Sequence, residues 1–480
     1  MSNQSMNWLS WADALSNMTT YLFPFATADF RVNLFSWSDL LFAPAFLYML
    51  YRLSENVYKK KYQDLPYGKY FMLAVKVKLG CIVMYWAINK FYYKGGDTYV
   101  YYWHILKIKQ LLFEDPTTAF NILFNSEDFQ TRLYMRDYFL NYGTYIYDKS
   151  SYIVILVGVF LSFIGLFSYI NISGIMAMFA LLGCWRVFKM FREMYPHLER
   201  EMAIATLFIP SVMYWACGIM KDSICIGFLG VLTYATYELF FKRKNIFLNI
   251  IYIGVCVWGL VQIRVYIILA FAPALAVWVF ARYRYTIKSP FIKALATPLF
   301  IGVGLISGVG VLTLMGSVAE KYAFENMMRT AQDTQNWLVF SSQMSGSTSY
   351  YNLGNVEYTT SGMLKIFPKA VNVSLFRPYI WEAKKPMLVP AAIEGIFTFF
   401  LTVRLLFRAG FLNFFRMIAS NPEVQFCLVF SIIFAFAVGF TSYNFGALAR
   451  YKIPLMPFYY IALFILSDSQ KKEAALHVKN

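Results

Sequence analysis

Charged side chains are scarce in this chain of 480 residues, because Asp, Glu, Lys and Arg together make up only 14% of it. A soluble domain typically has about 25%. Histidine is rarer still, and its three positions, at His104, His197 and His477, are too scattered to suggest a metal cluster. These shortages argue against an ordinary soluble enzyme and against a disordered, highly charged chain.

Cysteine is also sparse, and its six residues show no C-x-x-C spacing. We interpret them as small buried residues and expect neither disulfides nor zinc ligands. The first 31 residues lack a basic segment followed by an apolar one, so no cleaved signal peptide is evident. They are polar and aromatic instead. We therefore expect an N-terminal interfacial segment, 1–35, that lies along a membrane surface.

Hydrophobic residues, in contrast, are abundant. They make up 59% of the chain, aromatic residues make up 20%, and the mean hydropathy is +0.50. A membrane-spanning helix needs about 20 mostly apolar residues. The sequence therefore predicts an all-α, polytopic integral membrane protein with about 11–13 transmembrane helices. The candidate spans are 36–53, 70–92, 151–170, 172–190, 202–220, 223–241, 245–262, 265–281, 291–315, 388–408, 424–441 and 452–467.

Basic residues outnumber acidic ones by 43 to 26, which gives a formal net charge of +17. In a membrane protein this surplus is typical of cytoplasmic loops that face anionic lipid, so we expect membrane lipid and no nucleic acid as a partner. The clusters that set the orientation are Lys59 to Lys61, Arg186 to Arg192, Lys242 to Lys244, Arg282 to Lys288, Arg404 to Arg416, and Lys471 and Lys472. The loops near Asp97, Asp222, Arg264 and Arg450 then face the outside.

Two hydrophobic segments lie between Asp97 and Lys189, although this orientation allows only one crossing there. We therefore expect 151–170 to be an interfacial or re-entrant helix on the outer face. The predicted organisation is the N-terminal segment, a transmembrane domain at 36–315 with an outer loop at 94–150, a periplasmic loop at 316–387, and C-terminal transmembrane helices with a cytoplasmic tail at 388–480. Within the second loop, the polar tract 341–360 suits either a flexible lid or a disordered connection.

Asp97 follows two glycines at the outer end of a predicted span. Glycines permit a tight turn that brings backbone close to a ligand. A carboxylate at the membrane–water boundary can act as a general base or bind a metal. The alternative is a solvated turn residue, since Gly-Gly-Asp is a common turn string.

Lys221 and Asp222 lie in a very short turn between two apolar runs, so both charges stay near the outer interface. Asp222 either contributes to a site or caps the next helix, which would stabilise that helix by about 1 kcal/mol. Arg264 lies between two predicted spans. Its guanidinium either clamps a phosphate or reaches up to lipid headgroups.

Two later segments combine aromatic and charged residues. Arg377 and Glu382 form either a substrate site or a structural ion pair where the chain re-enters the membrane. Arg450, Tyr451 and Lys452 lie on the predicted outer side, against the positive-inside bias, which favours anion binding over a topological role; lipid headgroup contact is the alternative.

Glu394 stands alone in an apolar run and is costly to bury without a partner, for which Lys76 and Lys78 are candidates. No Walker A, GxGxxG, HExxH or GxSxG string stands out in a suitable context, so ATP-driven transport within this chain is not expected.

The order of these features resembles the GT-C class of integral-membrane glycosyltransferases and the related bacterial exopolysaccharide polymerases. In that class a first span leads to a large outer loop with an acidic residue near its start. Surface helices, two spans and a second acidic site follow. Gly-Gly-Asp97 matches the first feature, the stretch from Pro210 to Asp222 matches the second, and the stretch from Arg450 to Pro454 resembles an Arg-x-x-x-Pro motif at a late span.

The resemblance implies sugar transfer on the outer face of a bacterial inner membrane during cell-surface glycan assembly. The donor would be a polyprenyl-phosphate- or pyrophosphate-linked sugar, and the acceptor a glycan or glycolipid. Asp97 would be the general base of an inverting displacement, and Asp222 would orient the acceptor or a cation. Lys221, Arg264, Arg377, Glu382, Arg450, Tyr451 and Lys452 would form the lipid-phosphate and substrate site. A divalent metal, Mg or Mn, at Asp97 or Asp222 is compatible with this chemistry but not required.

Three other functions fit the same features. A polysaccharide polymerase or an O-antigen-ligase-like enzyme would differ only in its acceptor. A flippase or transporter of lipid-linked sugars would place its charges near mid-span and have two pseudo-symmetric halves, which the sequence does not show. A non-catalytic membrane scaffold would depend on its hydrophobic faces rather than on Asp97 and Arg450.

Overall fold

The computed structural model describes residues 34–35, 39–139, 143–284, 332–333, 336, 340, 349–354 and 360–479. The predicted span 291–315 lies outside these residues. So do nearly all of the N-terminal interfacial segment and most of the polar tract 341–360.

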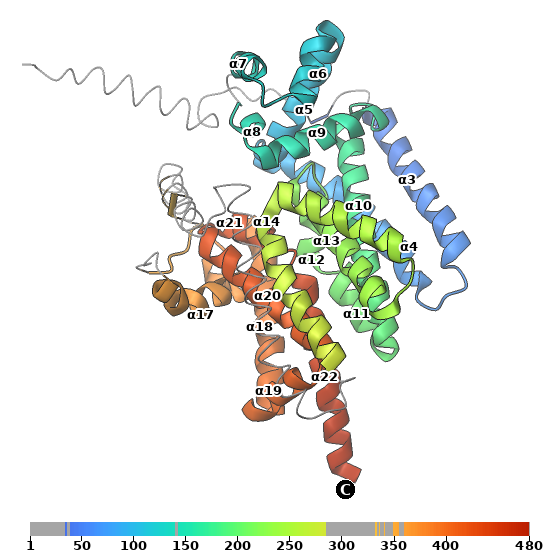
Figure 1. Ribbon diagram of the computed structural model, residues 1–480, viewed down its shortest axis with the longest axis vertical. Coiled ribbons are helices and arrows are strands. Elements are labelled where there is room, and N and C mark those ends of the chain that lie inside the picture. Colours follow the sequence, from blue (N-terminus) through green and yellow to red (C-terminus); the bar gives the residue numbers. More distant parts are fainter. Residues whose placement is uncertain are drawn as a thin grey trace, which may run out of the picture. The chain divides into compact units, whose positions relative to one another are not determined.

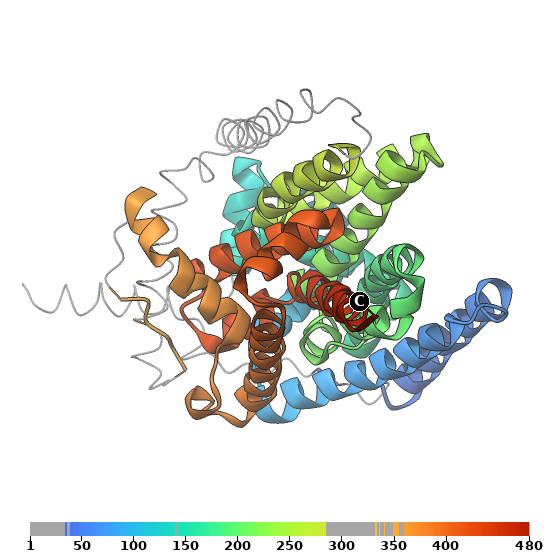
Figure 2. The same cartoon turned by 90° about the horizontal axis from the view of Figure 1, so that it is seen from below.

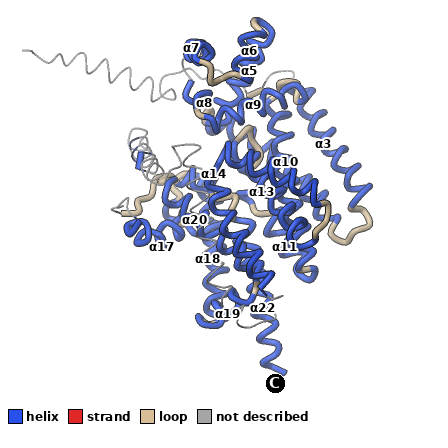
Figure 3. Tube along the Cα trace, viewed as in Figure 1, coloured by secondary structure: helices blue, strands red, loops and turns tan. Residues whose placement is uncertain are grey.

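Helices form every regular element of the described residues (Figure 3). Strand-like pairing there is limited to an isolated bridge between Tyr350 and Asn444. The all-α class predicted from the sequence is therefore confirmed for this part of the chain. The chain divides into two compact units. Unit 1 comprises Met1–Leu50, Ile82–Ile175 and Gly218–Lys221, and unit 2 comprises Tyr51–Cys81, Met176–Cys217 and Asp222–Asn480.

Unit 1 consists mainly of short helices. They are α5 (Asp97–Glu114), α6 (Pro116–Phe124), α7 (Phe129–Tyr138), α8 (Gly143–Tyr147) and α9 (Lys149–Ile164). Aspartates begin three of them: Asp115, Asp128 and Asp148 each accept a backbone N–H at the N-terminus of α6, α7 and α9. Such capping satisfies amide groups that have no partner within the helix. The predicted outer loop 94–150 is therefore largely helical.

Four helices pass from one unit to the other. They are α3 (Asp39–Lys61), α4 (Gly68–Ala87), α10 (Tyr169–Met194) and α13 (Lys221–Tyr237). The remaining helices of unit 2 are α11 (Glu199–Leu207), α12 (Pro210–Trp215), α14 (Ile246–Arg284), α17 (Thr360–Phe376), α18 (Val389–Ala409), α19 (Phe411–Ser420), α20 (Pro422–Thr441), α21 (Phe445–Tyr451) and α22 (Met456–Lys479). Short π- and 3₁₀-helical turns extend or connect them at Ile88–Tyr93, Pro196–Leu198, Glu238–Lys242, Ile380–Glu382 and Pro386–Leu388.

Helix α20 lies at the centre of the later part of unit 2. It packs against α14, α17 and α22, and these yellow to red helices lie together in two perpendicular views (Figure 1, Figure 2). Phenylalanines fill the contact. Phe426 stacks on Trp278 of α14, and Phe430 meets Phe458 of α22 edge to face.

Six helices of the described residues are long and apolar enough to cross a membrane. They are Gly68–Tyr93, Tyr169–Met194, Lys221–Lys242, Ile246–Arg284, Pro386–Ala409 and Pro422–Thr441. The chain thus has the character of a multi-pass membrane protein. The prediction of 11–13 spans is larger, partly because two predicted spans, 245–262 and 265–281, lie in the single helix Ile246–Arg284. Helix α9 has only 16 residues, which is short for a crossing. The interfacial or re-entrant placement expected for 151–170 stays a prediction.

The predicted span 202–220 differs most from its prediction. It is interrupted after Leu207, and α12 continues for only six residues from Pro210. Proline is well suited to a first helical position because its missing N–H has no intrahelical partner there. It cannot continue the preceding helix without breaking a hydrogen bond.

The predicted spans 245–262 and 265–281 correspond to the two parts of α14. Arg264 has a non-helical backbone, with φ −148° and ψ 80°, so two helices meet at this residue. Figure 1 shows α14 sharply bent. The predicted turn between two spans is therefore a kink of one residue.

Glycines let α10 and α13 approach each other closely. A Cβ atom on Gly230 would lie 2.2 Å from the carbonyl oxygen of Gly183, and one on Gly183 would lie 2.6 Å from the carbonyl oxygen of Ile226. Small residues at such crossings are common in membrane helices, where backbone contact replaces the hydrophobic effect as a source of packing energy.

Candidate functional site

Asp97 is the first residue of α5 in unit 1, and the residue is half-buried. Gly96 before it has φ 99°, a left-handed conformation that glycine adopts without strain. The Tyr145 hydroxyl donates to Asp97 Oδ1 at 2.7 Å. Asp97 is therefore held by a specific donor, and the residue as a whole is half-buried. Tyr145 lies 48 residues further along the chain, so no sequence pattern links it to Asp97.

Lys221 belongs to a second polar group of unit 1. Its ammonium lies 3.0 Å from Asp148 Oδ2 and donates to the Ser150 hydroxyl at 2.6 Å. Burial alone would raise the pKa of Asp148, but Lys221 and the hydroxyls of Ser150 and Ser151 outweigh it and hold this pKa below its usual range. The string Asp148-Lys-Ser-Ser before an apolar run is a helix-start signal that could have pointed to Asp148.

Asp222 and Arg264 form a buried ion pair in unit 2. Asp222 Oδ1 lies 2.6 Å from Arg264 Nη1, and the two side chains are 0% and 6% exposed. The sequence offered headgroup contact as the alternative for Arg264 and helix capping as the alternative for Asp222. Neither applies, because Arg264 does not extend to solvent. Asp222 is the second residue of α13, and its carboxylate faces an arginine. The kink of α14 at Arg264 accompanies this pairing.

Arg450 and Tyr451, at the end of α21, complete this group. Arg450 Nε lies 3.5 Å from Asp222 Oδ2. Both guanidiniums lie over the Tyr451 ring. The distance from the guanidinium carbon to the ring centroid is 4.7 Å for Arg264 and 4.9 Å for Arg450. We call Asp222, Arg264, Arg450 and Tyr451 the arginine cluster. It holds two positive charges and one negative charge, so it carries a net charge of +1.

The donor set of the arginine cluster does not suit a divalent metal. Two cations already face the single carboxylate of Asp222. Hard metal ions are usually bound by several oxygen ligands. Among the described residues, no three or more His, Cys, Asp or Glu side chains form a group that could hold a metal ion. Asp97 therefore belongs to no such group.

Arg377 and Glu382 form an ion pair, as one interpretation of the sequence suggested, with Arg377 Nε 2.9 Å from Glu382 Oε2. The backbone N–H of Tyr379 also donates to Glu382 at 2.9 Å. Burial raises the pKa of Glu382, but the bonds from Arg377 and Tyr379 outweigh it, so the pKa is lowered overall. Both charged side chains remain slightly less than one-fifth exposed.

Lys452 follows α21 and is fully buried. Its ammonium lies 3.4 Å from the carbonyl oxygen of Arg377. The Arg377 guanidinium in turn lies 5.2 Å from the Phe445 ring at the start of α21. The three consecutive residues Arg450, Tyr451 and Lys452 thus connect the arginine cluster with the Arg377–Glu382 pair.

Glu394 finds its partners on α12 rather than in a lysine of α4. It accepts the Ser211 N–H at 3.0 Å and the Ser211 hydroxyl at 2.7 Å. Lys78 instead donates to the carbonyl oxygen of Met213 at 2.9 Å, and Lys76 is exposed. A carboxylate therefore lies at the N-terminal end of α12 and an ammonium near its C-terminal end, which is the favourable order for a helix dipole.

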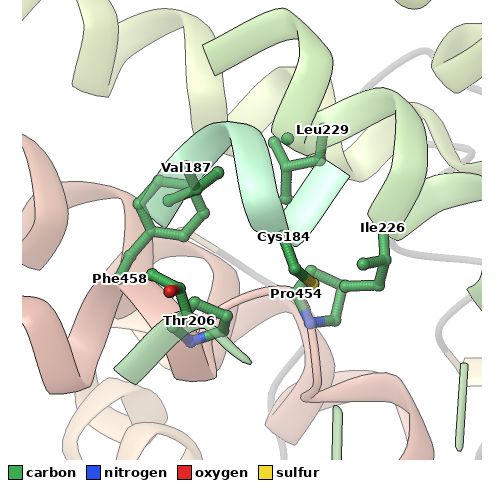
Figure 4. A pocket seen from close by; sticks show the side chains of 9 residues that line it. Cys184, Val187, Thr206, Ile226, Leu229, Pro454 and Phe458 are labelled. Atoms are coloured by element: carbon green, nitrogen blue, oxygen red, sulfur yellow. The ribbon is translucent and has the colours of Figure 1, made fainter. Parts of the chain in front are cut away.

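The six cysteines, His104 and His197 take no part in the ion pairs described above. All six cysteines are free, and five are buried, with Cys81 partly exposed. His104 is buried, and its Nδ1 lies within hydrogen-bonding distance of the Val100 carbonyl oxygen. His197 Nε2 lies 2.8 Å from Asp468 Oδ2. A small pocket of unit 2 is apolar and contains none of the predicted site residues (Figure 4). Its lining includes Cys184, Val187, Thr206, Ile226, Leu229 and Phe458.

The structure thus brings seven of the nine predicted site residues together in unit 2: Asp222, Arg264, Arg377, Glu382, Arg450, Tyr451 and Lys452. Asp97 and Lys221 belong to unit 1. Comparison of the chain with protein-family models, curated proteins and solved structures finds no match. Any assignment of function therefore rests on the residues themselves.

Proposed function

We propose that this chain is a membrane glycosyltransferase that uses a polyprenyl-phosphate-linked sugar on the outer face of a bacterial inner membrane. The observation that carries the proposal is Asp97. It is a half-buried residue four positions after the candidate span Gly68–Tyr93, and a tyrosine hydroxyl donates to its carboxylate at 2.7 Å. Short helices follow it, as in the GT-C class that the sequence resembles.

Asp97 is the general base of the proposed reaction. It takes the proton of an acceptor hydroxyl, and the acceptor oxygen attacks the anomeric carbon as the bond from that carbon to the phosphate oxygen breaks. The configuration at the anomeric carbon is inverted. Tyr145 orients the carboxylate, which favours a productive approach to the hydroxyl.

The arginine cluster of unit 2 is a separate candidate for binding lipid phosphate, argued from unit 2 alone. Arg450 supports this role, since its side chain is 17% exposed and it belongs to a cluster with net positive charge. Guanidiniums suit phosphate because they donate two parallel hydrogen bonds. Asp222 is then a positioning residue that orients Arg264 and Arg450, and no step requires a metal.

The test is complementation of a deletion strain with the Asp97→Asn variant, with protein levels checked by immunoblot. Asp115→Asn is the matched control, because Asp115 is an exposed helix cap of the same unit and asparagine also caps helices well. We expect Asp97→Asn to abolish the surface glycan and to leave lipid-linked precursor on the outer leaflet. The control should keep the glycan.

Other outcomes separate the remaining functions. If Asp97→Asn leaves single repeat units but removes long chains, the enzyme is a polymerase. Precursor trapped on the inner leaflet would identify a flippase. An unchanged glycan profile with normal protein level would remove Asp97 as the base and contradict the proposal.

A further inference from the structure

Helix α19 connects two candidate membrane spans but is itself too short to be one. It has 10 residues and joins α18 to α20. Gly410, with φ 73°, separates it from α18 and allows the chain to change direction. Figure 1 shows α19 set crosswise at the end of α18. A short helix between two consecutive spans is placed where the membrane meets water.

One face of α19 exposes large apolar side chains. Phe411, Leu412 and Phe415 are 66%, 83% and 52% exposed, and Phe407 in the last turn of α18 is 80% exposed. Positions 411, 412 and 415 lie on one side of a helix. Unit 2 therefore leaves a continuous apolar face uncovered here.

The opposite side of α19 is fixed to the rest of unit 2. Met417 is buried, and the Asn413 amide donates to Glu473 of α22 at 2.7 Å. Gln425 of α20 donates to the carbonyl oxygen of Ala419 at 2.7 Å. Because these contacts hold the helix in place, the apolar face cannot turn inward without breaking them.

Three arginines accompany the apolar face. Arg404, Arg408 and Arg416 are exposed, and none of them takes part in the ion pairs found among the described residues. No Asp or Glu occurs between Glu394 and Glu423. Exposed aromatic residues beside unneutralised arginines are typical of a helix that lies on an anionic bilayer surface.

We propose that the α19 surface, formed by Arg404, Phe407, Arg408, Phe411, Leu412, Phe415 and Arg416, binds anionic phospholipid. The aromatic and leucine side chains enter the acyl–headgroup boundary, and the arginines contact the lipid phosphates. A second copy of the chain fits less well, because a two-fold contact would place the same arginines opposite each other. This inference does not depend on the proposed function.

The test uses the purified full-length chain in mixed micelles, with tryptophan fluorescence reporting thermal unfolding during titration with phosphatidylglycerol or phosphatidylcholine. Phosphatidylglycerol should raise the midpoint of the wild-type chain more than phosphatidylcholine does. The combined variant Arg404→Gln, Arg408→Gln and Arg416→Gln should need about 10- to 100-fold more phosphatidylglycerol for the same shift. The control variant Arg132→Gln, Arg136→Gln and Lys149→Gln removes the same charge from exposed residues of the predicted outer loop, outside the cytoplasmic basic clusters, and should respond like wild type.

A second measurement covers the case in which the arginine variant is poorly folded. A fluorophore attached to Leu412→Cys in nanodiscs should be quenched by brominated phosphatidylglycerol, with the labelled wild-type chain as background. Three results would each overturn the proposal. The first is an equal response of the wild-type chain to both lipids, and the second is an arginine variant that responds like wild type. The third is an unquenched label in a chain that dimerises through this face.

Discussion

Asp222 and Arg264, 42 positions apart in the sequence, meet as a buried ion pair with 2.6 Å between Oδ1 and Nη1. The pair joins the start of α13 to the kink of α14. A buried charge that loses its partner is strongly unfavourable, whereas a buried pair as a whole adds little net stability. The relationship therefore fixes the arrangement of the arginine cluster more than it stabilises the fold.

This predicts strong coupling between the two residues. Asp222→Ala and Arg264→Ala should each lower the free energy of unfolding by about 3–5 kcal/mol, because each leaves one buried charge without its partner. The double variant should lose clearly less than the sum of the two. Unfolding of the four proteins in detergent measures the coupling. Additive losses would show that the pair does not hold the cluster together.

The contact between α10 and α13 gives a second prediction. Gly230→Ala should lower the unfolding midpoint, because its Cβ would lie 2.2 Å from the Gly183 carbonyl oxygen and the helices would have to separate. Gly254→Ala on α14 is the matched control, since its Cβ would meet no atom within 4 Å. The control should be neutral or slightly stabilising, because alanine favours a helix by about 1 kcal/mol. Equal midpoints for the two variants would contradict the close helix contact.

The sequence predicts helices well in this chain because the membrane constrains them so strongly. Runs of about 20 apolar residues leave few structures other than a helix. The two spans predicted on either side of Arg264 correspond to the two parts of α14. The apolar runs at 70–92 and 424–441 likewise correspond to candidate spans.

Side-chain partners were much harder to predict. Tyr145 and Ser211 are polar residues in no recognisable motif, and each is brought to its contact by tertiary packing. Glu394 and Ser211 are separated by 183 positions, so hydropathy contains no information about their contact. The interruption after Leu207 was missed for a related reason, since Pro210 lies inside a run that is otherwise apolar enough to span.

Glu394 provides a third prediction. Glu394→Ala should lower the free energy of unfolding by about 1–3 kcal/mol, because the buried N–H of Ser211 would lose its acceptor. Ser211→Ala should lower the free energy of unfolding by less, since the hydrogen bond from the Ser211 backbone N–H to Glu394 survives. Glu394→Gln should fall between the two. Chemical denaturation in detergent gives this order, and a Glu394→Ala variant as stable as wild type would contradict the role of this carboxylate at α12.

The lowered pKa of Asp148 predicts a pH dependence. The group releases its proton more readily in the folded chain than in the unfolded one. Its contribution to stability is therefore complete above the unfolded pKa, near pH 4, and is lost as the pH falls through the folded pKa. The gap in unfolding midpoint between wild type and Asp148→Asn should be constant near neutral pH and shrink in acid. A gap that does not change with pH would contradict the ion pair with Lys221.

The most direct test of the proposed function is the transfer kinetics of the purified chain in vesicles, with lipid-linked sugar extracted from the native membrane as donor. Asp97→Asn should lower turnover by about 10²- to 10⁴-fold while donor binding stays unchanged, because only proton removal is lost. Tyr145→Phe should lower turnover less, and Arg450→Gln should weaken donor binding. If Asp97→Asn retains full turnover, Asp97 is not the base and the glycosyltransferase assignment fails.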